Sequence, residues 1–298
     1  MKVRGAVLRE MGIDGPYAES RPLEIAELEL SGPGQGELLV RVGAAGLCHS
    51  DLSVIDGSRP RVMPMVLGHE AAGEVVEVGP AAEGFSVGDH VVMAFVPACG
   101  LCAPCRAGRP ALCDNGAAAN TAGSLLSGER RWEGGLHHHL GVSAFAEQVV
   151  VSAKSAVKVD SSLPFEIAAL FGCAVLTGVG AAVNSAQIKM GESVAIFGLG
   201  GVGLAALLGA HASGATTLVA IDRIPEKLEL ARELGATHTV MAGEGTVEEV
   251  RAATGGGAEK VIETVGSAAV LGQAYAATRR GGVTVTVGLP HPSQMLEI

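Results

Sequence analysis

Hydrophobic and polar residues alternate over roughly the first third of the chain, which is the period-two pattern of half-buried strands. Turn residues such as Gly32-Pro33-Gly34 and Gly79-Pro80 separate these segments. Cys, Pro and Gly are frequent in the stretch 97–141, which predicts irregular structure there. We therefore predict a β-rich region with strands near residues 1–10 (an edge strand), 37–42, 73–78, 90–95 and 146–151.

The pattern changes in the second half of the chain. Residues 164–184 have helical periodicity, and Pro164 stands where a helix typically starts. From residue 192 onward, apolar runs alternate with helical segments, the pattern of a doubly wound parallel α/β sheet. The predicted strands are 193–197, 217–221, 238–241, 260–264 and 283–287, and the predicted helices are 203–212, 225–234, 246–253 and 267–279.

A glycine-rich loop follows the first of these strands. Gly198, Gly200 and Gly203 have the G-x-G-x-x-G spacing, and the next predicted strand ends in Asp222. In this motif the first glycine permits a tight turn, the second lets the backbone approach a pyrophosphate, and the third lets the helix pack on the strand. Asp222 would accept hydrogen bonds from ribose hydroxyls and repel a 2′-phosphate, so the motif predicts NAD rather than NADP.

Composition and charge narrow the possible functions. With 298 residues, of which 48% are hydrophobic and 17% charged, the chain is long enough for two globular domains. Its net charge of −10 gives no support for nucleic acid or an anionic membrane as a partner. Residues 193–221 carry no Asp, Glu, Lys or Arg, but their six glycines argue against a membrane-spanning helix. We see no apolar signal segment at the N-terminus, so a cytoplasmic location is expected.

Four of the six cysteines, Cys99, Cys102, Cys105 and Cys113, form a C-x2-C-x2-C-x7-C pattern. Four thiolates in one short loop match a closed tetrahedral zinc site, although the same ligands also suit an iron–sulfur cluster. The bacterial ferredoxin spacing ends in x3-C-P, so the longer last gap favours zinc. We predict a structural zinc in the loop 97–115, with Arg106 close enough in sequence to offset its negative charge.

The other two cysteines, Cys48 and Cys173, stand far apart in the sequence. Each by itself could be a small buried hydrophobic residue. Together with His69, they would form a catalytic zinc site with three protein ligands and an open fourth position. Their separations are too wide for a local motif, so spacing alone leaves both interpretations open.

Several segments together resemble the zinc-containing medium-chain alcohol dehydrogenase family. They occur in the family's order: GLCHSD (46–51), LGHEAAGEVVEVG (67–79), FSVGDHVV (85–92), the four-cysteine loop, GCAVLTGVGAAV (172–183), the glycine loop and VGLP (287–290). The resemblance implies a GroES-like catalytic domain over residues 1–172 and a Rossmann NAD-binding domain over residues 173–298. It also implies zinc-dependent oxidation of an alcohol to an aldehyde or ketone, with reversible hydride transfer to NAD. A homodimer or homotetramer with one catalytic and one structural zinc per chain is expected.

The resemblance also implies roles for individual residues near the metal. Cys48, His69 and Cys173 would hold the catalytic zinc, and the four-cysteine loop the structural zinc. The remaining roles are a proton acceptor for the substrate (Ser50), a carboxylate that orients His69 (Asp51) and an acid beside the metal (Glu70).

Cofactor contacts follow from the same resemblance. His49, next to Cys48, could itself be a metal ligand, but neighbours on a strand point to opposite faces. The resemblance places it against the pyrophosphate, an interpretation favoured over a solvated surface histidine. The three histidines at 137–139 receive no role, and a non-metal function is favoured for them. The other expected cofactor contacts are Gly198, Gly200, Gly201, Val202, Gly203, Asp222, Lys227, Thr177 and Val287.

Two features depart from the family's pattern. Ser53 stands where some relatives have the histidine that ends a proton relay. The family usually continues well past VGLP, so we expect an incomplete Rossmann sheet that lacks its last strand. A non-catalytic zinc- and nucleotide-binding remnant, or a dehydrogenase for a thiol adduct of formaldehyde, are the alternative functions. The sequence does not indicate the particular alcohol or the preferred direction.

Overall fold

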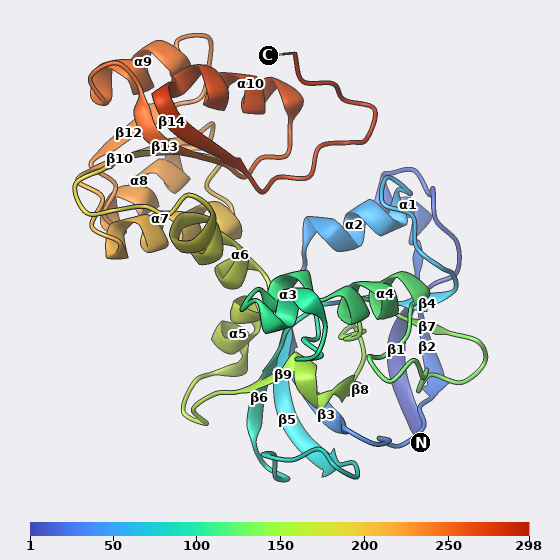
Figure 1. The fold of residues 1–298 in the computed structure, drawn as a ribbon. Helices are drawn as coiled ribbons and strands as arrows, with labels where there is room; N and C mark the ends of the chain where they lie inside the picture. Colours follow the sequence, from blue (N-terminus) through green and yellow to red (C-terminus); the bar gives the residue numbers. More distant parts are fainter. Residues whose placement is uncertain (298) are drawn as a thin grey trace. The chain divides into compact units, whose positions relative to one another are not determined.

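The computed structural model describes residues 1–297 and divides the chain into two compact units, Met1–Cys173 and Ala174–Ile298 (Figure 1). Each unit has hydrophobic clusters of its own. Among the described residues no single helix is long and apolar enough to cross a membrane, and one bent helix pair, Phe165–Gly172 with Ala174–Ser185, passes that test by length and composition only.

The first unit contains two sheets, because its alternating segments pair mainly in antiparallel fashion. One sheet has the strand order β2-β1-β4-β7 and the other β8-β3-β5-β6-β9. Side chains from the inner faces of both sheets form its largest core. The strands are β1 (Lys2–Leu8), β2 (Leu23–Glu29), β3 (Glu37–Ala45), β4 (Met65–Val66), β5 (Ala71–Val78), β6 (His90–Met93), β7 (His137–His138), β8 (Gln148–Ser152) and β9 (Ala156–Lys158).

The prediction that the first strand lies at an edge is wrong. Strand β1 pairs with β2 along its whole length and with β4 through Val7 and Leu8. Its charged positions alternate because Lys2 and Arg4 form exposed ion pairs with Glu27 and Glu147 of neighbouring segments. The alternation of charged and apolar residues therefore indicates a strand with one solvated face. An internal strand of an antiparallel sheet can also have one solvated face, so the pattern does not identify an edge strand.

Helices of the first unit are short. The stretch 97–141, for which we predicted irregular structure, contains a nine-residue helix, α4, whose N-terminus is capped by the Cys113 sulfur accepting from Gly116 N. The helices are α1 (Tyr17–Ser20), α2 (His49–Ile55), α3 (Ala103–Arg106), η1 (Pro110–Leu112), α4 (Asp114–Ala122), η2 (Ala153–Ser155), α5 (Phe165–Ala168) and η3 (Ala169–Gly172).

The second unit is a parallel sheet of five strands in the order β12-β11-β10-β13-β14. This is the doubly wound order in which β10 lies between β11 and β13, and a crevice forms at the carboxyl ends of the strands. The elements are α6 (Ala174–Gly180), η4 (Ala181–Ser185), β10 (Ser193–Phe197), α7 (Gly201–Ala212), β11 (Thr217–Asp222), α8 (Pro225–Glu233), β12 (His238–Met241), α9 (Thr246–Ala253), β13 (Ala258–Glu263), α10 (Ala268–Ala277) and β14 (Thr278–Thr286).

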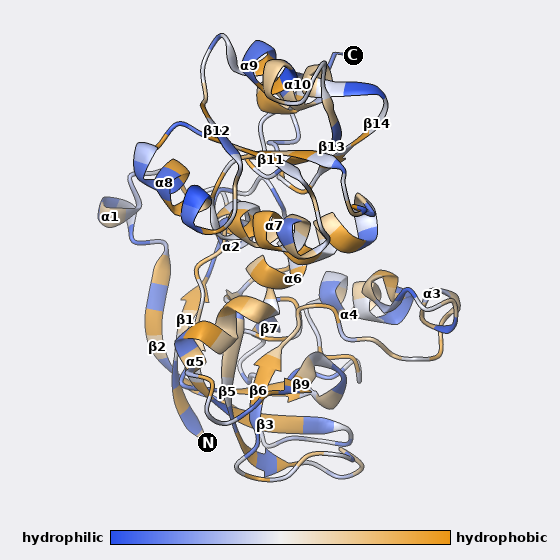
Figure 2. Ribbon diagram, turned by 90° about the vertical axis from the view of Figure 1, so that its left-hand side faces the viewer, coloured by the Kyte–Doolittle hydropathy of each residue, from blue (hydrophilic) through white to orange (hydrophobic). Residues whose placement is uncertain are grey.

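Both faces of this sheet are covered by helices. Val194 and Ile196 of β10 pack into the cluster that includes α7, whereas Ala195 and Phe197 pack into the cluster on the opposite face with α9 and α10. Figure 2 shows hydrophobic residues along the strands and α7, and hydrophilic residues on α8 and α9. The central strands β10 and β11 are nearly uninterrupted apolar runs because they are buried on both faces, whereas β12, β13 and β14 carry polar or charged residues.

Most boundaries differ from the prediction by a few residues, and two differences have a structural cause. Strand β14 begins at Thr278, because Thr278 pairs with Ala258 where we predicted the end of a helix. The helical segment predicted over 164–184 is broken at Cys173, whose φ of −142° and ψ of −70° are not helical. The backbone at Gly172 packs so closely that an added Cβ would lie 2.6 Å from the Met93 carbonyl oxygen.

Candidate active site

Cys48, His69 and Cys173 converge within the first unit, although they come from three separate segments. Cys48 immediately precedes α2, His69 immediately precedes β5, and Cys173 lies at the break in the helical segment. Their ligand atoms all lie within 4.8 Å of one another, and the two Sγ atoms are 3.9 Å apart. The broken helix therefore has a clear consequence, because it places Cys173 against Cys48.

The donor set of this cluster fits zinc. Two Zn–S bonds of about 2.3 Å at a tetrahedral angle separate the sulfurs by about 3.8 Å, close to the distance between Cys48 and Cys173. The hydrogen bond with the Cys173 thiol lowers the pKa of Cys48 to about 3 against the opposing effect of burial, with a further contribution from His69. Cys48 is therefore held as a thiolate, the form that binds metals.

A buried carboxylate, Asp51, joins the segments that carry these residues. Its Oδ2 accepts from Cys48 N at 3.3 Å, and its Oδ1 accepts from Gly68 N at 3.2 Å and lies 3.1 Å from His69 Nδ1. Burial opposes ionisation of Asp51, but the close imidazole rings of His139 and His69 hold its pKa well below the usual range. Since Nδ1 of His69 faces Asp51, Nε2 is the nitrogen available to the cysteines.

His139 is a second imidazole at Asp51, and sequence reasoning assigned it no role. Its Nδ1 lies 3.1 Å from the same Oδ1 atom, and its ring meets that of His69 edge-on with centroids 5.4 Å apart. Burial is the main cause that lowers the pKa of His139, so the ring is neutral. The triplet of histidines at 137–139 was visible in the sequence, but nothing local indicated that His139 would face Asp51.

The remaining residues expected near the metal occupy different environments. The Ser50 hydroxyl lies 3.6 Å from Cys48 Sγ, and Glu70 is buried, with its carboxyl group packed over Gly46. His49 is exposed in the first turn of α2, so the strand geometry we invoked for it is wrong. Ser53 is buried and donates its hydroxyl to the His49 carbonyl at 3.0 Å.

The four-cysteine loop forms a second cluster in the first unit. The sulfur atoms of Cys99, Cys102, Cys105 and Cys113 lie within 4.8 Å of one another, and backbone N–H groups donate to Cys99 and Cys113. Hydrogen bonds from Leu101 N and Cys102 N lower the pKa of Cys99 to about 6, while desolvation, foremost, and the neighbouring sulfurs raise that of Cys105 to about 12. Four sulfurs that converge within this distance suit a divalent cation that neutralises them together.

A cavity of about 530 Å³ lies at the carboxyl ends of the parallel strands in the second unit. Gly198, Gly200, Asp222 and Lys227, which we predicted to bind the cofactor, line it. Arg223, which sequence reasoning missed, also lines it next to Asp222. The other predicted cofactor contacts, Gly201, Val202, Gly203, Thr177 and Val287, are not among the residues that line this cavity.

The glycines of the loop meet different constraints. Gly198 has a φ of +91°, a backbone conformation that favours glycine. A Cβ on Gly203 would lie 1.9 Å from the Gly198 carbonyl oxygen, so helix and strand pack too closely there for any side chain. At Gly200 an added Cβ meets nothing within 4 Å, so this position faces open space beside the start of α7. Such a space at a helix N-terminus fits a pyrophosphate.

Asp222 organises the same loop through its carboxylate. Its Oδ2 accepts from Leu199 N at 2.7 Å, its Oδ1 accepts from Ile224 N at 3.0 Å, and Lys227 Nζ lies 3.8 Å away. The acid is nearly buried, with 9% of its surface exposed. It therefore both closes the turn after β10 and presents negative charge to the cavity.

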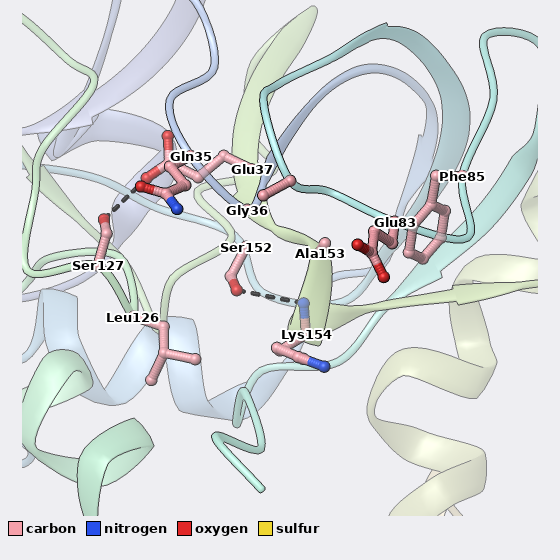
Figure 3. Close-up of a pocket in the computed structure, with 11 residues that line it drawn as sticks. Gln35, Gly36, Glu37, Glu83, Phe85, Leu126, Ser127, Ser152, Ala153 and Lys154 are labelled. Atoms are coloured by element: carbon pink, nitrogen blue, oxygen red, sulfur yellow. Dashed lines mark hydrogen bonds between the residues drawn. The ribbon is translucent and has the colours of Figure 1, made fainter.

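A separate cavity of about 360 Å³ lies elsewhere in the first unit (Figure 3). Glu37 and Ser127 line one side, hydrogen-bonded to each other at 2.8 Å, and Glu83, Phe85 and Lys154 line the other. The buried Glu37 carboxylate is also paired with Arg131 at 2.7 Å. Because Glu37 is already bound by Ser127 and Arg131, its carboxylate has a structural role, and we assign no reaction to this cavity.

A cluster of two cysteines and a histidine, a four-cysteine loop and a dinucleotide-type α/β unit define the class of zinc-dependent dehydrogenases. Two family descriptions match the chain, "Alcohol dehydrogenase GroES-like domain" over residues 34–161 and "Zinc-binding dehydrogenase" over residues 201–298. The chain belongs to the zinc-containing medium-chain alcohol dehydrogenase family, as the resemblance predicted.

Individual relatives agree with this assignment. An NDMA-dependent alcohol dehydrogenase of Amycolatopsis methanolica is 39% identical over 300 residues, which are 99% of this chain and 79% of that protein. An S-(hydroxymethyl)glutathione dehydrogenase of Synechocystis sp. is 37% identical over 99% of this chain and 80% of its own length. The crystal structure of an alcohol dehydrogenase zinc-binding domain protein from Burkholderia ambifaria is 38% identical with a TM-score of 0.90, covering 100% of this chain and 80% of that one. The predicted fold class, GroES-like plus Rossmann, is confirmed.

Proposed function

We propose that this chain oxidises an alcohol to an aldehyde or ketone with NAD, using the cluster of Cys48, His69 and Cys173 in the first unit. The observation that carries the proposal is the convergence of these three ligand atoms around the carboxylate of Asp51. We assign residues 1–172 as the GroES-like catalytic domain and residues 173–298 as the NAD-binding domain.

The chain's own residues prepare the metal site. Two thiolates and a neutral imidazole balance the charge of a divalent cation and leave one coordination position for a substrate. Zinc, when bound, supplies a Lewis acid for the substrate oxygen, and NAD supplies the hydride acceptor. Ser50, beside Cys48, is placed to accept the hydroxyl proton of the alcohol. The exposed His49 in the next position is assigned to the pyrophosphate.

The second unit supplies the cofactor site. The N-terminus of α7 and the open space at Gly200 accommodate the pyrophosphate, and Asp222 accepts hydrogen bonds from the adenosine ribose. Lys227 contacts the same ribose, and Thr177 and Val287 are assigned to the nicotinamide half. A homodimer or homotetramer is expected, in line with the family.

A second substrate class is favoured by one relative and one residue. The relative from Synechocystis is named for S-(hydroxymethyl)glutathione, a thiol adduct that carries carboxylates. In this chain the half-buried Arg61 has an Nε with no hydrogen-bond partner among the described residues, and its charge contributes to lowering the pKa of His139. An anionic substrate would therefore meet a cation near the proposed metal site.

The test is a measurement of NADH formation with primary and secondary alcohols and with formaldehyde plus thiols, before and after removal of zinc by a chelator. We expect turnover that disappears on zinc removal and returns when zinc is restored. Turnover that is unaffected by the loss of both zinc ions would refute the proposal. Zinc binding and NAD binding without turnover of any substrate would instead support the non-catalytic alternative.

A further inference from the structure

We propose that His139 is a positioning residue for the catalytic zinc, acting through Asp51. This inference rests on the proposed function, because it takes Cys48, His69 and Cys173 as the zinc ligands. In this arrangement His139 fixes the Asp51 carboxylate, and Asp51 fixes the two segments that carry Cys48 and His69.

The contacts of Asp51 show why a third partner matters. Its Oδ2 accepts from Cys48 N, and its Oδ1 accepts from Gly68 N and approaches His69 Nδ1. All three of these groups belong to segments that carry ligands. Among the described residues that contact this carboxylate, His139, whose Nδ1 lies 3.1 Å from Oδ1, comes from a third segment that carries no proposed ligand. It therefore gives the carboxylate a further point of attachment beyond the two segments that carry Cys48 and His69.

The loop after β7 is built to place His139 there. His139 is 1% exposed, its N–H donates to Ser143 Oγ at 2.9 Å, and its carbonyl accepts from Val142 N at 3.0 Å. The loop then returns along the segment before His69, where Ala144 N donates to the Gly68 carbonyl at 3.0 Å. Residues 139–144 are thus anchored to the backbone that ends at His69.

This loop also has an unfavourable backbone. Leu140 has a φ of +51° and Ser143 a φ of +57°, the left-handed region that residues with a Cβ avoid. Such conformations are unfavourable for residues with a Cβ and persist where the surroundings determine them. These two positions shape the turn that directly follows His139 and carries its hydrogen-bond partner Ser143.

The polar contacts of His139 also favour positioning over packing. Its Nδ1 is completely buried and makes no well-aligned hydrogen bond among the described residues, so Asp51 Oδ1, 3.1 Å away, is the group that compensates it. Asp51, His69 and His139 also form a group within metal-binding distance of one another. A metal ion bound by that group is the competing interpretation, and the experiment below distinguishes the two.

The experiment measures zinc release from the full, zinc-loaded chain into a colorimetric chelator, with total zinc counted beforehand. His139→Leu keeps the bulk but removes the ring N–H. We expect release of the catalytic zinc to become about 10- to 100-fold faster, the effect typical of losing an outer-shell partner, while the structural zinc leaves at its original rate. His137→Leu, in the same triplet but without contact to Asp51, is the matched control and should leave both rates unchanged.

A conservative pair of variants separates positioning from folding. The Asn amide N–H occupies nearly the position of histidine Nδ1, whereas the Gln amide occupies nearly that of Nε2. His139→Asn should therefore restore slow release to within a few-fold of the parent protein, and His139→Gln should not. In cobalt-substituted protein, the visible spectrum of the catalytic site should change in His139→Gln and be preserved in His139→Asn.

Three outcomes contradict the inference. Equal release rates in the parent protein and all His139 variants would mean that His139 only fills space in the core. A third equivalent of zinc that disappears with His139 would identify a metal site instead. A Cys48→Ser variant is measured in parallel. If it holds as much zinc as the parent protein, the proposed function itself is refuted, separately from the inference about His139.

Discussion

The four-cysteine loop and the Cys48–His69–Cys173 cluster lie in the same unit and offer similar ligands, but they are assembled in opposite ways. The loop draws its sulfurs from within fifteen residues of sequence and orients them with backbone N–H groups from the loop and from α4. The other cluster joins sulfurs that are 125 positions apart and is organised around the buried side chain of Asp51.

This difference teaches how a structural and a catalytic site can share a ligand chemistry. Four cysteines fill every position around a zinc ion and carry net negative charge, so the loop suits a closed site that stabilises the fold. Two cysteines and a histidine leave one position and no net charge, which suits a site that must bind and release a substrate. The buried carboxylate holds the imidazole without occupying the open position.

The largest expected effect is on the catalytic cluster. Cys48→Ser replaces a thiolate that the structure holds ionised with a hydroxyl that binds zinc poorly, so one of two zinc ions should be lost. Turnover should fall at least about 1,000-fold, which corresponds to several kcal/mol of metal contribution. Metal analysis and steady-state kinetics check this. A variant that loses one zinc and keeps its activity would show that we have exchanged the roles of the two clusters.

A smaller effect is expected at Ser50. Removing its hydroxyl in Ser50→Ala should lower kcat about 100-fold, the lower range for loss of a positioned proton acceptor. Both zinc ions should remain, because Ser50 is not among the proposed ligands. Ser50→Thr, which keeps the hydroxyl, is the matched control. Loss of zinc in the alanine variant would instead place Ser50 in the metal's coordination.

The structural loop should respond in stability rather than in chemistry. Cys113→Ser removes a buried sulfur that accepts from Cys99 N and Gly116 N. If the loss costs about 1–3 kcal/mol, as for a buried group left unpaired, the Tm should fall by roughly 2–10 °C. Thermal unfolding followed by circular dichroism measures this. Activity per folded molecule should be nearly unchanged, and a specific loss of kcat without destabilisation would contradict the assignment.

The smallest effect concerns the charge beside the loop. Arg106 is adjacent to Cys105 but exposed, so its charge is screened by water. Arg106→Gln should weaken zinc retention by the loop less than about five-fold, as expected from an exposed pair contributing 0–1 kcal/mol. A competition titration with a chelator measures the change. A much larger effect would mean that the charge of the loop is balanced by this arginine rather than by the metal.

Much of the second unit could be predicted from the sequence. Its central strands, β10 and β11, are buried on both faces and therefore appear as nearly uninterrupted apolar runs, and the glycine loop and Asp222 are close enough in sequence to be recognised by spacing. The start of β14 at Thr278 was missed, because pairing with β13 overrode local helical periodicity there. Arg223 was missed as well, since a surface arginine in the sequence gives no sign that it lines a cavity.

The catalytic cluster shows where such prediction ends. The amino-acid sequence by itself determined the four-cysteine loop and the nucleotide loop, because each is made by residues close enough in the chain to meet through local backbone geometry. Only the tertiary structure decided that a helix breaks at Cys173, that Asp51 joins three segments and that His139, rather than the equally buried His138, faces Asp51. These contacts join residues tens to over a hundred positions apart, and packing between sheets, which no local pattern encodes, brings them together.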